Sequence, residues 1–305
     1  MNEEKISKTI SVDSDKELDV SLNHIKDFYY SSRPHRRAYF DRGVLANFVP
    51  YKDEYVGSCR TGNMSGDDKI QILKFDSDLN LVYSRECTKG EDPRSFIYNG
   101  HPYAYVVDPH HSETGSWIFH YKVVDLISGH VTILSIDQVP DTKVQILGKN
   151  WIPLVRDNIL YFVVTINPHL TILRCQLVDG RCTWVTPFEL VKDELKITTS
   201  RGSTPLIFSH AHDRYVGIGH RTHNCNHHSP FLYTVSKDFS TAYVGPDISI
   251  KRNGILDGPE TRVSDALSIY EKGGNLFCCI SHYPTQLGDT QRVCSSLYGI
   301  KINEQ

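Results

Sequence analysis

The stretch Glu91-Asp92-Pro93-Arg94 joins two carboxylates to a guanidinium directly before a strand-like run, Ser95-Phe96-Ile97-Tyr98. A carboxylate beside a cation can serve as an acid or a base in group transfer, because neighbouring charges set its pKa. The proline that follows Asp92 disfavours a helical backbone at that residue, so we expect Asp92 to be extended. Asp92 is therefore the candidate catalytic residue.

Three later stretches also place polar groups just before strands: Lys149-Asn150-Trp151-Ile152-Pro153, Arg201-Gly202-Ser203-Thr204-Pro205 and Val263-Ser264-Asp265. The segments that begin at Glu91, Lys149 and Arg201 start 58 and 52 residues apart. After each polar motif come an apolar strand, a short Asn/Gly/Asp turn and a second strand rich in Tyr, Val and Ile. A period of this size with about four strands per unit is typical of a β-propeller.

The unit from Tyr55 to Tyr83 precedes these segments and brings the number of units to five. The sequence therefore predicts an all-β fold, a five-bladed β-propeller over residues 36–305. A pair of β-sandwiches would explain the strands but not the repeated polar motif. Residues 1–35 are predicted to form a short N-terminal extension, in which an apolar stripe favours one short helix over Asp13–Phe28.

In a propeller the polar residues that begin the innermost strands converge at one end of the central channel, where pockets commonly form. Many of these residues are basic, and arginine offers paired donors to an anion such as phosphate. Trp151, Tyr103 and Tyr161 offer flat apolar faces to a sugar ring. The candidate substrate-binding residues are Arg60, Asn63, Glu91, Arg94, Lys149, Asn150, Trp151, Arg201 and Asp265. The candidate phosphate-binding residues are Lys149, Arg201, His220 and Arg221.

Over residues of about 40–300 these motifs resemble those of the family 130 glycoside phosphorylases and of the β-1,2-mannosyltransferases and phosphorylases of glycosyltransferase family 108. The resemblance implies that Asp92 is a general acid, which protonates the departing glycosidic oxygen through a sugar hydroxyl. Phosphate, held by basic residues, would attack the anomeric carbon with inversion. Mannose as the sugar, and a sugar phosphate or nucleotide sugar as the donor, are likewise implied. The chain departs from the family in the arginine-glycine-serine of Arg201–Ser203 and in its histidine-rich stretch at 220–228.

Two other functions stay open. An inverting glycoside hydrolase uses two carboxylates, an acid and a base that activates water, and Asp265 is the candidate second carboxylate. A non-catalytic glycan-binding propeller would keep the sugar site but would gain little from an acid such as Asp92. A propeller that binds only proteins would not need a cationic mouth.

Composition excludes several classes of partner. The net charge of -3 and pI near 6.6 argue against nucleic acid, and no apolar run approaches the ~20 residues of a membrane helix. The N-terminus lacks the apolar core of a signal peptide, so a cytoplasmic location is expected, with the secretory pathway open for a trimmed chain. No cofactor is expected beyond phosphate or sugar phosphate as substrate.

The eight cysteines follow no metal-binding spacing. Cys175 and Cys182 flank a predicted hairpin and are the candidates for a cross-strand pair. Reduced cysteines are nevertheless expected, as is usual in the cytoplasm. The stretch from His223 to His228 contains residue types that bind transition metals. No second cluster in the sequence completes such a site, so no metal is predicted.

Overall fold

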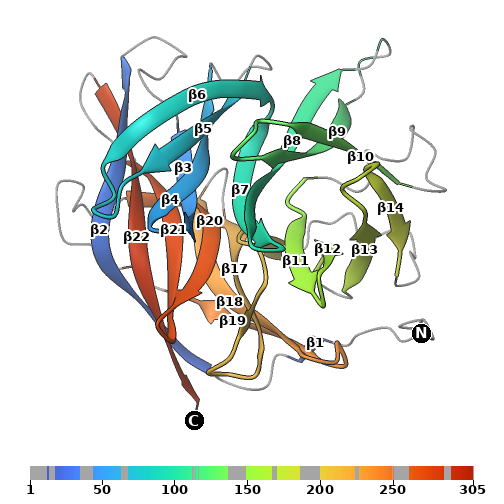
Figure 1. The fold of residues 1–305 in the computed structure, drawn as a ribbon. Helices are drawn as coiled ribbons and strands as arrows, with labels where there is room; N and C mark the ends of the chain where they lie inside the picture. The colour runs from blue at the N-terminus through green and yellow to red at the C-terminus, as the bar shows by residue number, and fades with distance from the viewer. Residues whose placement is uncertain are drawn as a thin grey trace.

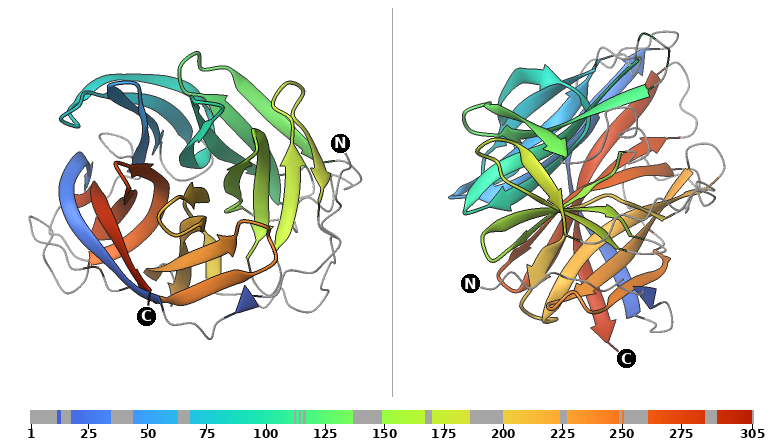
Figure 2. Two further views of the ribbon diagram at one scale, coloured as in Figure 1. Left: turned by 60° about the horizontal axis from the view of Figure 1, so that its bottom comes forward. Right: turned by 90° about the vertical axis from the view of Figure 1, so that its right-hand side faces the viewer.

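The computed structural model describes residues 12–13, 18–34, 44–62, 68–111, 113, 115, 117–136, 149–166, 170–185, 200–223, 227–248, 250, 261–284 and 290–304. In these residues every regular element of three residues or more is a β-strand (Figure 1), and no helix is long and apolar enough to cross a membrane. The strands form five antiparallel blades around a common axis (Figure 2). The predicted five-bladed β-propeller is confirmed.

The first three blades follow one another along the chain, and each has four strands. Blade one contains β3 (Val44–Tyr51), β4 (Glu54–Thr61), β5 (Lys69–Phe75) and β6 (Leu81–Lys89). Blade two contains β7 (Glu91–Tyr98), β8 (His101–His111), β9 (Trp117–Asp125) and β10 (Val131–Ile136). Blade three contains β11 (Ile152–Arg156), β12 (Ile159–Thr165), β13 (Thr171–Cys175) and β14 (Arg181–Trp184).

The last two blades depart from this simple order. In blade four, two short strands share the first position, giving β15 (Ser200–Gly202), β16 (Ile207–Ser209), β17 (Arg214–His223), β18 (His227–Ser236) and β19 (Ala242–Asp247). The short β1 (Val12–Asp13) pairs with β19. Blade five contains β20 (Thr261–Lys272), β21 (Asn275–Pro284), β22 (Thr290–Glu304) and β2 (Leu18–Pro34).

The N-terminal strand β2 lies beside β22 and completes the last blade (Figure 2, blue beside red). The helix predicted over Asp13–Phe28 is therefore wrong for the described residues 18–28, and 18–34 belong to the propeller and not to a separate N-terminal extension. The ladder with β22 shifts register between His24 and Lys26 and between Asp27 and Tyr29. Each shift breaks the two-residue alternation of a strand, and this interruption gave the apolar residues their apparent helical spacing.

The turns between the first two strands of three blades follow the predicted Asn/Gly/Asp pattern. Asn99-Gly100, Asp157-Asn158 and Gly273-Gly274 all have positive φ, between 50° and 74°. Positive φ at both residues of a two-residue turn matches the twist of the strands on either side. Residues that tolerate this conformation are therefore needed there.

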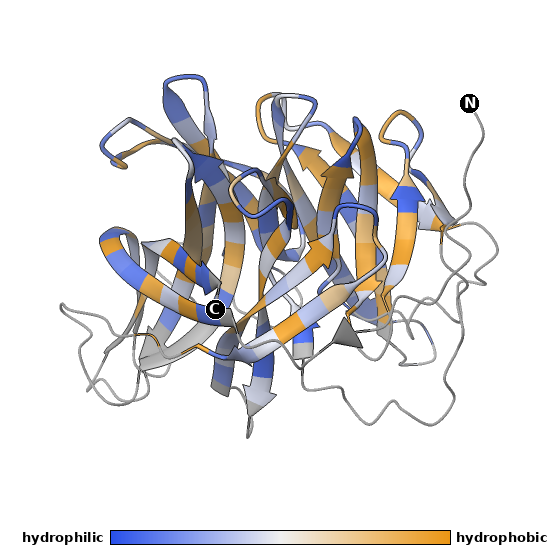
Figure 3. Cartoon of the chain, turned by 90° about the horizontal axis from the view of Figure 1, so that it is seen from below, coloured by the Kyte–Doolittle hydropathy of each residue, from blue (hydrophilic) through white to orange (hydrophobic). Residues whose placement is uncertain are grey.

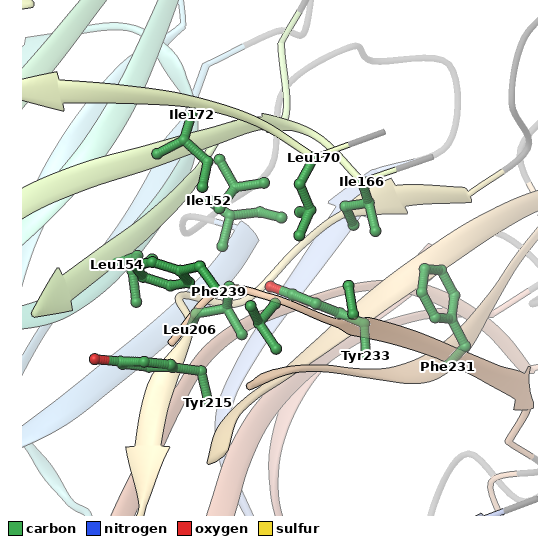
Figure 4. Close-up of a cluster of buried hydrophobic side chains, with 13 residues drawn as sticks. Ile152, Leu154, Ile166, Leu170, Ile172, Leu206, Tyr215, Phe231, Tyr233 and Phe239 are labelled. Carbon is green, nitrogen blue, oxygen red and sulfur yellow. The ribbon is translucent and has the colours of Figure 1, made fainter. Parts of the chain in front are cut away.

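Within the described residues, six buried clusters each join two neighbouring blades. Figure 4 shows one of them, in which Ile152 and Leu154 of blade three pack against Leu206 and Tyr233 of blade four. Apolar and polar residues alternate along many strands (Figure 3), so one face of a strand can meet the neighbouring blade. Burying each large side chain contributes about 1.5–3 kcal/mol. These clusters hold the blades in fixed positions around the axis.

The candidate cysteines are indeed cross-strand partners, but the expectation of reduced cysteines is wrong for this pair. Cys175 on β13 lies directly opposite Cys182 on β14, and the two form a disulfide. This bond closes the outer hairpin of blade three.

Candidate functional site at the start of the first strands

The first strands of blades one, two and five contact one another at the axis of the propeller. Near its beginning, each of these strands departs from regular pairing. The shifts lie between Val44 and Asn47 in β3, between Glu91 and Arg94 in β7, and between Val263 and Asp265 in β20. Such bulges redirect side chains and are common beside active sites.

Asp92 lies in the bulge of β7. Glu91 pairs with Val107 and Arg94 with Tyr105, so two residues of β7 oppose one residue of β8. The φ angle of Asp92 is 51°, and the prediction of an extended Asp92 is therefore wrong. A non-glycine residue in this region carries a conformational cost of order 1–3 kcal/mol, which the surrounding contacts must offset.

The carboxylate of Asp92 belongs to a buried ion network, here called the Asp92 network. Arg60 Nη1 lies 3.1 Å from Asp92 Oδ1, and Lys149 Nζ lies 2.8 Å from Asp92 Oδ2. Arg60 Nη2 also contacts Glu91 at 3.0 Å and Asp68 at 2.7 Å. Lys149 Nζ reaches Glu91 at 2.8 Å. The two cations thus hold three carboxylates from blades one and two in one place.

This balance corrects the expectation of a mouth with excess positive charge. Arg60 and Lys149 face three carboxylates within 3.1 Å, so the network has no formal excess of cations. Buried charges of one sign are costly unless opposite charges compensate them. Asp68, which precedes β5, supplies the carboxylate that the sequence motifs did not include.

The network keeps Asp92 ionised. Burial by itself would raise the pKa of this carboxyl group, but Lys149 and then Arg60 outweigh burial and hold its pKa well below 3.8. Burial by itself would likewise lower the pKa of Arg60 and of Lys149, yet the facing carboxylates, Asp92 first, raise both. At neutral pH Asp92 can accept a proton but holds none to donate.

Arg94, Asn150 and Trp151 connect blades two and three. Arg94, which is 1% exposed, donates from Nη2 to Asn150 Oδ1 at 2.6 Å and from Nη1 to the Trp151 carbonyl at 2.7 Å. The indole of Trp151 is completely buried and stacks on Tyr121 with ring centroids 3.7 Å apart. Both side chains are enclosed in the core, which counts against the substrate-binding roles predicted for Arg94 and Trp151, and these roles stay predictions.

A second polar cluster, the His220 cluster, lies between blades four and five. His220 Nδ1 is 2.6 Å from Ser203 Oγ and 2.9 Å from Asp265 Oδ1, and its ring stacks on His228 at 4.4 Å. Burial favours a higher pKa for Asp265, but His220 outweighs it and lowers that pKa, while the charge of Asp92 acts in the opposite direction. Asp92 and Asp265 are therefore close enough to influence each other.

Of the remaining predicted residues, Arg201 lies beside the His220 cluster and Arg221 points away from it. Arg201 lies on β15 opposite His220, and no hydrogen bond or ion pair joins its side chain to another described residue. Arg221 follows His220 on β17 and thus faces the other side of the sheet. It binds Asp247 and the Gly245 carbonyl, which counts against its predicted role in phosphate binding, and that role stays a prediction. Asn63 lies outside the described residues.

The sequence motifs missed a residue that supports the bulge at Asp92. Asn47, which is fully buried, donates from Nδ2 to the Pro93 carbonyl at 3.0 Å and accepts from the Ser95 amide at 2.9 Å. One signal was present, because Asn47 is the only polar residue in the apolar run Val44–Val49. Asp68 stands among polar residues and offered no such signal.

The sequence matches no model of a known protein family and no curated protein. The fold is similar to that of an α-L-arabinofuranosidase from Lactobacillus brevis (TM-score 0.52, 11% identity, 84% of this chain and 90% of that one). It is also similar to the catalytic domain of a GH62 α-L-arabinofuranosidase from Coprinopsis cinerea (TM-score 0.55, 11% identity, covering 89% of this chain and 97% of that one). A third similar structure is an α-L-arabinofuranosidase from Podospora anserina in complex with cellotriose (TM-score 0.55, 9% identity, covering 91% of this chain and 96% of that one). The chain thus has the five-bladed propeller fold of GH43 and GH62 glycoside hydrolases.

Proposed function

We propose that this protein is a carbohydrate-active enzyme that makes or breaks glycosidic bonds, with Asp92 as the group that exchanges the proton. The observation that carries this proposal is the Asp92 carboxylate, held between Arg60 and Lys149 where the first strands meet. A fold in common with glycoside hydrolases supports the class of reaction.

The charge state of the site favours transfer from a sugar phosphate or a nucleotide sugar. Asp92 and Asp265 both have lowered pKa values, so neither is ready to protonate a departing alcohol. A phosphate leaving group needs no such proton. In the transfer direction the acceptor hydroxyl attacks the anomeric carbon, the bond to phosphate breaks, and ionised Asp92 takes the hydroxyl proton. Phosphorolysis would need a protonated Asp92 to donate to the departing oxygen, and the lowered pKa of Asp92 disfavours that direction.

The resemblance to families 130 and 108 extends this proposal to β-mannosides. Lys149, Arg201 and His220 are the proposed contacts to phosphate. The Lys149 side chain is 35% exposed, and the described residues provide no partner for Arg201. Both can therefore turn toward a bound anion. Phosphate would compete with Glu91 for Lys149.

Inverting hydrolysis is the second candidate. It is favoured by the names of the similar structures, all of them glycosidases, and by the mutual influence of Asp92 and Asp265. Two carboxylates on either side of a sugar could serve as base and acid. The lowered pKa of Asp265 counts against it as the acid.

The products of the reaction distinguish these functions. The protein is incubated with mannose 1-phosphate or GDP-mannose plus mannose and short β-mannosides, and separately with aryl α-L-arabinofuranosides. Phosphate release with a longer mannoside is expected, and GDP release would identify the donor as a nucleotide sugar. Free sugar from the glycosides alone would favour hydrolysis. Glycan binding without turnover of any donor would contradict the proposal and indicate a binding propeller.

A further inference from the structure

Three side chains of metal-binding types meet where blades four and five join. His220 lies on β17, His228 on β18 and Asp265 on β20. The register opposes Thr222 to His228, so His220, two residues before Thr222, is on the same face as His228. β18 in turn pairs His228 with Val263, two residues before Asp265. Three strands therefore supply one ligand each.

The ligand atoms are close to the spacing that a metal ion requires. One nitrogen or oxygen atom of each residue lies within 4.8 Å of the others. Asp265 Oδ1 is 2.9 Å from His220 Nδ1 and 4.0 Å from His228 Nδ1. Ligands on tetrahedral zinc, with bonds of about 2.0–2.2 Å, lie roughly 3.4 Å apart. The two observed separations differ from this value by about half an ångström, one below it and one above it. The rings of His220 and His228 stack 23° from parallel, so one ring must also rotate before both nitrogens point at one ion.

We propose that His220, His228 and Asp265 bind a divalent transition-metal ion, with zinc as the ion that fits best. Two imidazole nitrogens and a carboxylate oxygen suit zinc and its neighbours, whereas calcium and magnesium prefer oxygen ligands alone. Metal binding would take the place of the contact between His220 Nδ1 and Asp265 Oδ1. Three protein ligands leave a fourth position for water or a sugar hydroxyl, as in catalytic zinc sites.

Ser203 supports the metal site as an outer partner. Its Oγ donates to Asp265 Oδ1 at 3.2 Å and lies 2.6 Å from His220 Nδ1. A serine–histidine–aspartate relay needs its two partners on different ring nitrogens, whereas here both contact Nδ1. The geometry therefore excludes a relay through this histidine. Hydrogen bonds to a ligating carboxylate are common around metals and orient it.

Metal binding is tested without reference to enzymatic activity. The full-length protein is treated with EDTA, dialysed, and titrated with zinc chloride by calorimetry, and cobalt(II) absorption reports the coordination. We expect one equivalent of zinc to bind. His228→Ala and Asp265→Asn should weaken binding by more than about 100-fold, whereas Ser203→Ala should weaken it by about 10- to 100-fold, as loss of an outer partner does.

A matched control is His101→Ala. His101 Nε2 lies 2.9 Å from Asp125 Oδ1, the same separation as in the His220–Asp265 pair. Within the described residues His101 belongs to no group of three metal-binding side chains, so zinc binding should not change. His228→Gln, at a side chain that is 21% exposed, replaces the alanine variant if that one misfolds.

Several results would overturn the proposal. They are the absence of zinc binding at micromolar concentrations, equal binding by wild type and the ligand variants, or tighter binding of calcium than of zinc. Any of these would leave the His220 cluster as a hydrogen-bonded contact between blades.

Discussion

The Asp92 network shows how a single residue depends on its neighbours. Arg60 contacts three carboxylates, and its 6% exposure leaves water little access to compensate them. A buried ion pair contributes little compared with apolar packing, but removing one partner leaves charges unpaired. Arg60 is thus as important for stability as for the state of Asp92.

Arg60→Met should therefore lower the free energy of unfolding by about 3–5 kcal/mol. Urea denaturation measures this change. Lys69→Met on the neighbouring strand is the control, since its pair with Glu86 is exposed (43% and 56% of the side chains) and should be worth less than about 1 kcal/mol. Equal losses in the two variants would argue against a buried network.

The depressed pKa of Asp92 also predicts a dependence of stability on pH. Because its folded pKa lies below the unfolded value of 3.8, its stabilising contribution is complete above about pH 5 and is lost as pH falls toward the folded pKa. The difference in unfolding free energy between wild type and Asp92→Asn should then be constant from neutral pH to about pH 5 and shrink below pH 4. A difference that stays constant into strong acid would contradict the assignment.

Part of the site could be predicted from the sequence at this scale. Asp92 and Lys149 stood out because charged residues preceded strands in each repeat, and the structure brings them together. Arg94 and Trp151 belonged to the same motifs but are enclosed in the core. Spacing along the chain indicates where a strand begins, yet the face on which a side chain emerges depends on bulges and on the next blade.

At the scale of elements, β2 is the part that sequence periodicity misjudged. Phe28 is 8% exposed and packs edge-on against Phe48 at 4.7 Å, whereas Ile25 on the same strand is 50% exposed. In the predicted helix both residues belonged to one apolar stripe. The partner strand β22 lies more than 250 residues away in the sequence, so nothing local revealed the pairing.

Two substitutions in β2 distinguish strand from helix. Phe28→Ala should cost about 3–5 kcal/mol, because it leaves a cavity between blades five and one. Ile25→Ala should change stability by less than about 0.5 kcal/mol, as exposed positions usually do. Thermal and urea unfolding give both values. Comparable losses at the two positions would support a single buried stripe instead.

At the scale of the whole molecule, the site forms because the five blades close into a ring and bring residues of different blades together. Arg60 comes from blade one, Asp92 from blade two, His220 from blade four and Asp265 from blade five, while Lys149 lies just before blade three. The repeat predicted the ring and the end of the strands at which polar groups gather. It did not predict the pairing of charges, because every contact of Asp92 joins residues from different blades and depends on how neighbouring blades pack. The same applies to the proposed metal ligands, which come from three strands.

The rate of glycosyl transfer by Asp92→Asn tests the central claim most directly. The variant is compared with wild type and with Asp108→Asn, which alters another carboxylate of blade two, one that pairs with Lys122 at 2.6 Å. We predict that Asp92→Asn lowers turnover by about 10²- to 10⁴-fold, as loss of a general base does, while mannoside binding persists and Asp108→Asn stays close to wild type. Turnover by Asp92→Asn equal to that of the Asp108→Asn control would show that Asp92 is not the group that exchanges the proton.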